Sequence, residues 1–273
     1  MRDYQVKPVR SLARGLLVLR VLQEMRAASL HDLHRATGLP KPTLTRILHT
    51  CHQQGLVWQR MADGAFLPSY LPQRRAPRDD DADWLAEIAS PILERLCAAV
   101  RWPSVLSVPR LHYMEVIETN SRRAYFDELP DRPVNFRANM LRSASGRAYL
   151  SFCPERERQA VLRRLRERDI AGHELARDPE AIRRIVTATR RRGYSVRDPD
   201  FGGDYARTRT EVDDGRNSIA MPVVVNGQVL ASVNLTWRSG VMTVQQIAVQ
   251  HLGELRAAVT LIGEQAAAVL PAA

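Results

Sequence analysis

The chain contains few cysteines and no long apolar run. Its three cysteines, Cys51, Cys97 and Cys153, are too few and too widely spaced for a disulfide framework or a CxxC metal site. No apolar run of about 18 residues occurs, and the N-terminus lacks the apolar stretch of a signal peptide. These absences argue against a disulfide-rich secreted domain and a membrane span. We therefore expect a cytoplasmic protein without a membrane partner.

Lysine is nearly absent. Lys7 and Lys41 are the only two, so 38 of the 40 basic residues are arginine, and 30 acidic residues leave a net charge of +10. Hydrophobic residues make up 45% of the 273 residues, which is enough for a buried core and excludes a disordered chain. The length favours about two domains.

The excess charge is concentrated in the first part of the chain. Residues 1–78 contain 13 basic and 4 acidic residues, a net charge of +9, whereas residues 79–273 contain 27 basic and 26 acidic residues, a net charge of +1. A small basic unit before a near-neutral one suggests a nucleic-acid-binding module followed by a module of another kind. The alternative is a basic surface that only keeps the protein soluble.

The pattern of residues 11–67 predicts a winged helix-turn-helix. A first helix is expected over residues 11–25, with Ser11 as its N-cap and an apolar stripe that includes Leu12 and Leu16. A second helix is expected over residues 30–37, capped by Ser29 and ended by Gly38, and a third over residues 42–54. Two short strands, 57–60 and 65–67, are expected around an Asp-Gly turn.

The third helix has the residues expected of a DNA-reading helix. Threonines can contact phosphates or thymine methyl groups, arginine can donate two hydrogen bonds to guanine, and a cation at a helix start can hold a phosphate. The first helix and the wing could flank the groove. The predicted DNA contacts are Arg14, Lys41, Thr43, Thr45, Arg46, His49 and Arg60. The alternative is a solvated face of a protein-binding winged helix.

Two pairs of histidines stand at the helical spacing that metal ligands often have. His31 and His34 form one pair, and His49 and His52 form another. No carboxylate or second cysteine completes a closed site beside either pair. We therefore expect no metal and no cofactor.

The remainder of the chain predicts an α+β domain. An amphipathic helix follows an acidic run and forms a linker segment over residues 79–101. Strands and helices then alternate over residues 102–273, with a hairpin around Asn226-Gly227 and a closing helix over residues 243–269. This order indicates a sandwich with an antiparallel sheet.

Six segments together resemble the IclR family of bacterial transcriptional regulators. They are residues 11–16 (SLARGL), 37–48 (TGLPKPTLTRIL), 55–57 (GLV), 143–148 (SASGRA), 192–194 (RGY) and 218–223 (SIAMPV). The wing end, residues 66–70, departs from the family's YxLG-like run, and Arg147 replaces its more usual lysine. Within the family, the sequence is most similar to the branch that activates catabolism of phenylpropionates and hydroxyphenylpropionates. The resemblance implies a linker helix that helps dimerisation and a GAF-like effector-binding domain.

The resemblance also implies where an effector would bind, between a helix start near Ser145, a segment near Asp204 and the hairpin strands. A helix N-terminus suits a carboxylate, an upstream arginine could add a charge-assisted pair, and apolar side chains could hold a ring. The predicted effector contacts are Arg142, Ala144, Ser145, Gly146, Asn217, Ser218, Met221 and Asn234, with Trp102, Met114, Tyr125 and Phe136 as further apolar walls. The alternatives are surface charge for the arginine and core packing for the apolar residues.

These observations predict a regulator that binds operator DNA as a dimer or a dimer of dimers. We expect an activator of an aromatic-acid catabolic operon that responds to a small aromatic carboxylic acid, with RNA polymerase as a further candidate partner. One alternative is a repressor released by another small organic acid. Another is an enzyme tethered to a DNA-binding module, but Ser145-Gly146 lacks the GxSxG elbow and no catalytic residues are expected.

Overall fold

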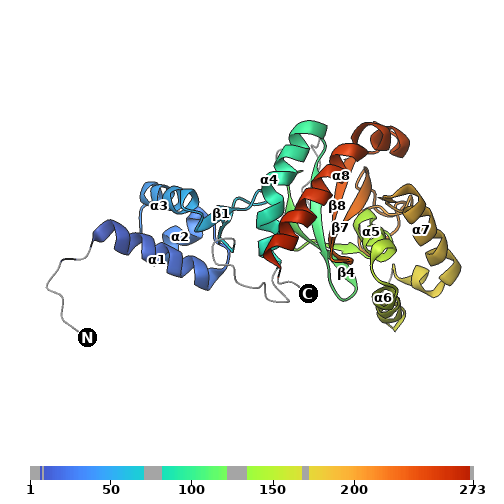
Figure 1. Ribbon diagram of the computed structural model, residues 1–273, viewed down its shortest axis with the longest axis horizontal. Helices are drawn as coiled ribbons and strands as arrows, with labels where there is room; N and C mark the ends of the chain where they lie inside the picture. Colours follow the sequence, from blue (N-terminus) through green and yellow to red (C-terminus); the bar gives the residue numbers. More distant parts are fainter. Residues whose placement is uncertain (1–6, 8, 71–81, 122–133, 168–171, 271–273) are drawn as a thin grey trace. The chain divides into compact units, whose positions relative to one another are not determined.

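The computed structural model describes residues 7, 9–70, 82–121, 134–167 and 172–270 (Figure 1). Residues 71–81 lie outside the described part. They make up most of the segment between the predicted wing and the helix that follows it. The chain divides into two compact units, Met1–Arg75 and Ala76–Ala273, called here the N-terminal and C-terminal units. No helix in the described part is both long and apolar enough to cross a membrane.

The N-terminal unit is a winged helix-turn-helix. Its helices are α1 (Arg10–Met25), α2 (Leu30–Thr37) and α3 (Lys41–Gln53), and its antiparallel wing strands are β1 (Val57–Gln59) and β2 (Phe66–Pro68). The predicted cap of α2 is present, because the Ser29 hydroxyl accepts from the Asp32 amide and the Asp32 carboxylate accepts from the Ser29 amide. Gly38 ends α2 in the left-handed region, with φ of 68°.

The start of α1 differs from the prediction. Val9, not Ser11, is the N-cap, and Ser11 lies inside the helix. The apolar stripe is buried only toward its C-terminal end, at Val18 and Leu22, whereas the side chains of Leu12 and Leu16 are 60% and 57% exposed. The reason is that the core of this unit reaches α1 only from Val18 onward. Helical periodicity identified a helix, but it could not tell which half of the stripe has a partner.

The C-terminal unit is an α+β sandwich with one six-stranded antiparallel sheet in the order β5-β4-β3-β8-β7-β6. The strands are β3 (Ser104–Pro109), β4 (Tyr113–Thr119), β5 (Arg137–Asn139), β6 (Ser195–Val196), β7 (Arg216–Val225) and β8 (Gln228–Arg238). The helices are α4 (Asp83–Val100), α5 (Ala144–Phe152), α6 (Glu155–Glu167), the 3-10 helix η3 (Glu174–Arg177), α7 (Pro179–Arg192) and α8 (Val244–Val269).

Helices pack on both faces of this sheet (Figure 1). On β7, Ala220 packs against Ala144 and Ala148 of α5, whereas Val223 lies against Gly263 of α8. Since side chains alternate between the two faces along a strand, α5 and α8 cover opposite faces. The helix α4, which contains most of the predicted linker segment, contacts α8, β3 and β4 and is part of the C-terminal unit.

The hairpin turn is the one that the sequence predicts. Asn226 and Gly227 both have positive φ, 50° and 76°, as a two-residue turn of the I′ type requires. Two short elements, β5 and η3, were not predicted. They contain three and four residues, which is too short for a periodic pattern to develop.

Candidate functional site

The helix α3 presents a polar face opposite its buried stripe. Leu44, Leu48 and Cys51 are buried in the core of the unit. Lys41, Thr45, Arg46 and His49 are exposed, and Thr43 is half-buried. The hydroxyl of Thr45 donates to the carbonyl of Lys41 at 3.0 Å. The exposed face thus offers two cations, a histidine ring and threonine methyl groups.

The two predicted flanking arginines are placed differently. Arg14 is exposed on α1. In contrast, the side chain of Arg60 is 11% exposed, and its guanidinium forms two hydrogen bonds with the Asp63 carboxylate of the wing turn, at 2.6 and 3.1 Å. Burial by itself would raise the pKa of Asp63, but the bonds from Arg60 and from the Ala65 amide outweigh it and lower that pKa. Arg60 therefore stabilises the wing turn.

The paired histidines make local contacts to the backbone. The ring Nδ1 of His34 lies 2.8 Å from the carbonyl oxygen of Leu39, and that of His52 lies 3.1 Å from the carbonyl oxygen of Val57. The first contact holds the turn before α3, and the second joins the end of α3 to the wing.

The C-terminal unit contains a small cavity, called here the effector cavity, between the sheet and the start of α5. Its volume is about 30 Å³. It is lined by Val105, Ser107, Val116, Phe136, Ala138, Ser143, Ala144, Ser145, Arg197, Phe201, Ser218, Asn234 and Thr236. The lining combines two aromatic rings with serines and the first turn of a helix.

Four of the eight predicted effector contacts line this cavity: Ala144, Ser145, Ser218 and Asn234. Asn217 and Met221 do not line it. They are separated from Ser218 by odd numbers of residues, so strand alternation places their side chains on the opposite face of the sheet. Of the additional walls, Phe136 lines the cavity, Trp102 and Met114 are buried elsewhere, and Tyr125 lies outside the described residues.

Gly146 has a packing role. A Cβ atom at this position would lie 2.2 Å from the carbonyl oxygen of Met140, which is impossible without moving the backbone. Only glycine lets the first turn of α5 approach this segment so closely. The Ser143 hydroxyl caps the same turn by accepting from the Gly146 amide at 3.0 Å. Gly146 does not line the effector cavity, and its predicted contact with the effector stays a prediction.

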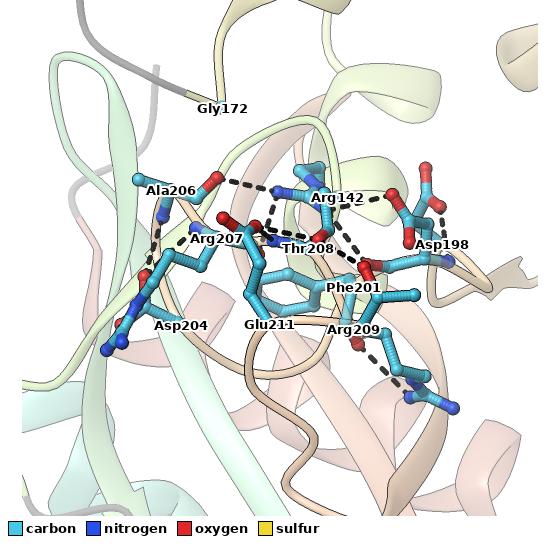
Figure 2. Close-up of polar contacts among 12 residues, drawn as sticks. Arg142, Gly172, Asp198, Phe201, Asp204, Ala206, Arg207, Thr208, Arg209 and Glu211 are labelled. Atoms are coloured by element: carbon cyan, nitrogen blue, oxygen red, sulfur yellow. Dashed lines mark hydrogen bonds and ion pairs between the residues drawn. The ribbon is translucent and has the colours of Figure 1, made fainter.

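Arg142 is buried in the segment Asp198–Asp214, called here the cavity loop. Its guanidinium donates to the carbonyls of Asp200, Ala206 and Arg207 at 2.8, 3.1 and 3.1 Å (Figure 2). The side chain is 10% exposed. Arg142 therefore holds the cavity loop closed, whereas the prediction placed it against an effector carboxylate.

Other contacts reinforce the cavity loop. Arg209 and Asp214 donate from their amides to the carbonyls of Asp200 and Gly202, at 2.7 and 2.9 Å. The Arg207 guanidinium and two loop amides hydrogen-bond the Asp204 carboxylate and lower its pKa well below its usual range (Figure 2). The loop is thus cross-linked internally and positions Phe201 at the cavity.

Arg197 and Phe201 are cavity residues that the sequence analysis missed. The Arg197 guanidinium donates to the Phe201 carbonyl and to Asp214 at 2.8 Å, and it lies 4.7 Å from the centroid of the Phe201 ring. Among so many arginines, nothing in the sequence distinguishes Arg197. The glycine pair after Phe201 was the available indication of a tight loop, because a Cβ at Gly202 would lie 1.5 Å from the Val212 carbonyl oxygen.

One polar atom in the cavity is unpaired among the described residues. The amide nitrogen of Asn234 donates to the Thr236 hydroxyl at 3.3 Å, but its carbonyl oxygen Oδ1 is buried without a hydrogen-bond partner. A buried acceptor without a donor is costly, by about 1–3 kcal/mol. Asn234 Oδ1 is thus available to accept a hydrogen bond from a donor inside the cavity.

The two units match two family domains. Residues 11–60 match the IclR helix-turn-helix domain, and residues 83–263 match the C-terminal domain of bacterial transcriptional regulators of the IclR type. The chain is 25% identical over 192 residues to the HTH-type transcriptional regulator KipR of Bacillus subtilis, covering 68% of this chain and 73% of that protein.

Solved structures share the fold. An IclR homolog from Microbacterium hydrocarbonoxydans, solved in complex with 4-hydroxybenzoate, matches 94% of this chain and 99% of its own with a TM-score of 0.52 and 23% identity. The IclR of Thermotoga maritima matches 95% of this chain and 100% of its own with a TM-score of 0.53 and 14% identity.

The family match extends over both units and covers most of the chain. The N-terminal match includes the whole of α3 with its exposed polar face, and the C-terminal match includes the whole lining of the cavity. The protein therefore belongs to the IclR family, as a DNA-binding transcriptional regulator with a ligand-binding C-terminal domain.

Proposed function

We propose that the protein regulates an aromatic-acid catabolic operon, as an activator that responds to a small aromatic carboxylate bound in the effector cavity. The observation that carries the effector class is the lining of that cavity. Phe136 and Phe201 offer apolar faces for a ring, and the first-turn amides of Ala144 and Ser145 at the start of α5 suit a carboxylate. The 4-hydroxybenzoate complex of the Microbacterium homolog supports the same class.

The unpaired Oδ1 of Asn234 narrows the proposal to a ring that bears a hydroxyl group. A phenolic O–H could donate to this oxygen and remove the cost of leaving it unpaired. A hydroxylated aromatic acid, such as a hydroxyphenylpropionate, then satisfies both ends of the site.

Binding requires the cavity to enlarge. Its volume of about 30 Å³ is far below the roughly 150 Å³ of a cavity that accepts benzene. The cavity loop contributes Phe201 to the wall and is the segment whose outward movement would make room. We therefore expect the effector to shift the protein toward a form with this loop displaced.

The test is a thermal-shift screen of the full chain against phenylpropionate, hydroxyphenylpropionates, benzoates and short aliphatic acids. The hydroxylated aromatic acids should raise the melting temperature most. Asn234→Leu should abolish the preference for hydroxylated over unhydroxylated acids. Asn217→Leu, the same change on the other face of the sheet, should keep that preference. A response to aliphatic acids alone would reject the aromatic proposal, and formation of product would favour the enzyme alternative.

DNA binding is assigned to the exposed face of α3. We propose that Lys41, Thr43, Thr45, Arg46 and His49 contact DNA, with Arg14 of α1 as a further contact and Arg60 positioning the wing. The net charge of +9 on residues 1–78 predicts an affinity for DNA that falls steeply with salt.

Self-association is proposed through α1. The exposed side chains of Val9, the N-cap of α1, and of Leu12 and Leu16 recur at helical spacing, where the core of the unit does not cover this helix. A second copy of the chain, placed symmetrically, could bury them. Leu12→Glu with Leu16→Glu should therefore lower the mass measured by sedimentation and weaken binding to a palindromic operator. Leu56→Glu, at another exposed apolar position, should change neither.

Activation and repression are separated by a genetic comparison. Deleting the gene should lower effector-induced transcription of the target operon if the protein is an activator. A rise in uninduced transcription would instead identify a repressor released by a small organic acid. Activation predicts a productive contact with RNA polymerase at the same promoter.

A further inference from the structure

The helices α6 and α7 hold a large share of the positive charge of the C-terminal unit. Together they contain ten arginines and four glutamates, a net charge of +6. Residues 79–273 as a whole carry a net charge of only +1. The rest of this region is therefore net acidic, and the two helices form a strongly basic region on a unit that is otherwise balanced.

A groove lies between these helices, separate from the effector cavity. Its volume is about 330 Å³, roughly ten times that of the effector cavity. Its lining includes the apolar side chains of Leu162, Ile182 and Val186, called here the apolar floor, of which Leu162 and Ile182 are mostly buried in the core of the unit. Four arginines also line the groove, two from α6 and two from α7: Arg158, Arg166, Arg183 and Arg190. A second hollow beside Arg183, lined also by Arg184 and Arg191, extends the basic surface along α7.

The arginines of the groove are not equally available. Arg158 is buried, donates to the Leu150 carbonyl and pairs with Glu155, so it belongs to the fold. Arg183 pairs with Glu180. Arg190 is exposed and uses its Nε to donate to the Ser151 carbonyl at 2.6 Å, and it forms no ion pair with a described residue. Arg166 forms no ion pair with any described residue.

This combination favours an acidic protein segment over nucleic acid. Few of the arginines around the groove are uncommitted, whereas a DNA surface typically neutralises about 6–10 phosphates. A phosphate backbone also has no apolar group that could pack against the apolar floor. Protein interfaces, in contrast, combine an apolar centre with a polar rim that is enriched in arginine.

We propose that the groove between α6 and α7 is a docking site for an acidic segment of a partner protein that carries apolar side chains. The apolar side chains bind against Leu162, Ile182 and Val186, and the carboxylates pair with Arg166 and Arg190. The interaction is distinct from effector binding and from DNA binding, because none of these residues belongs to the effector cavity or to the N-terminal unit.

The test uses the full chain and two labelled synthetic peptides, measured by fluorescence anisotropy. One peptide contains glutamates together with leucines at helical spacing. The other peptide has serine in place of each leucine. Arg166→Glu should weaken binding of the leucine peptide about tenfold, equivalent to about 1.4 kcal/mol. Arg163→Glu, the same change on an exposed position of α6 outside the groove, should leave it within about twofold. Arg46→Glu should also leave it unchanged, which separates the groove from the basic N-terminal unit.

Three results would overturn the proposal. Equal binding of the two peptides would mean that the apolar floor has no role. Equal loss in Arg163→Glu and Arg166→Glu would mean that only overall charge matters. Loss of nonspecific DNA binding in Arg166→Glu, without loss of peptide binding, would identify a nucleic-acid surface instead.

Discussion

Replacing Arg142 by methionine should release the cavity loop. The guanidinium donates three hydrogen bonds to loop carbonyls, at 2.8, 3.1 and 3.1 Å, and the side chain is only 10% exposed. Hydrogen bonds to charged groups contribute about 1.5–3 kcal/mol each, but the three carbonyls regain water once the loop opens. We therefore expect a loss of about 2–4 kcal/mol in the free energy that holds the loop closed, less than the sum of the three bonds.

Hydrogen exchange measures this loss where it occurs. The amides of Phe201, Arg209 and Asp214 donate to carbonyls within the loop and are protected while the loop is closed. A loss of 2 kcal/mol or more corresponds to exchange about thirtyfold faster or more at these amides. Arg207→Met is the matched control, because Arg207 lies in the same loop but its side chain is 57% exposed and, among the described residues, forms an ion pair only with Asp204. That variant should change exchange by a factor of about two or less.

The effector should also bind more tightly to Arg142→Met, because the cavity loop must move outward for binding and less free energy is then needed to displace it. The reasoning fails if the loop amides of Arg142→Met exchange at the rate of the unaltered protein. It also fails if the control accelerates exchange as much as Arg142→Met does.

Three further outcomes are expected. Arg46→Ala should weaken operator binding by about 1–3 kcal/mol and leave effector affinity unchanged in a thermal-shift titration; equal loss of both would contradict separate functions for the two units. Ser29→Ala removes one side of the α2 capping box and should lower the free energy of unfolding of the N-terminal unit by about 1 kcal/mol in urea, whereas Ser11→Ala should have little effect because Ser11 is not a cap. Burial raises the pKa of the Cys153 thiol to about 11, so the folded state loses stability as the pH rises from about 9 to about 11, and Cys153→Ala should flatten this part of the melting-temperature profile. An unchanged slope would contradict that cause.

Local patterns predicted α2 and the turn between β7 and β8 well because both are set by short-range chemistry. Ser29 and Gly38 set the two ends of α2 through contacts within a few residues. The Asn226-Gly227 turn needs only its own two positive φ angles. The α1 stripe was predicted less well, because exposure of Leu12 and Leu16 depends on which other elements reach that helix.

The effector cavity was predicted only in part, for the same reason. Ser145 and Ser218 belong to segments that resemble the family, Asn234 was predicted from its place on a hairpin strand, and all three line the cavity. Asn217 and Met221 lie within or beside the same motif but point to the other face, because alternation along the strand places neighbours on opposite sides. Which face of β7 lies against α5 depends on packing between elements that are far apart in the sequence, and no local pattern specifies it.

By itself, the sequence determined that this is a basic helix-turn-helix unit followed by a near-neutral α+β unit, since charge balance, capping residues and turn residues are local properties. Only the tertiary structure decided the use of the individual arginines. Arg142, Arg197 and Arg166 look alike in the sequence, yet the first holds a loop, the second lines a cavity and the third stands at the edge of a groove. The physical reason is that the role of a guanidinium depends on the carbonyls, carboxylates and rings that surround it. Those groups come from distant parts of the chain.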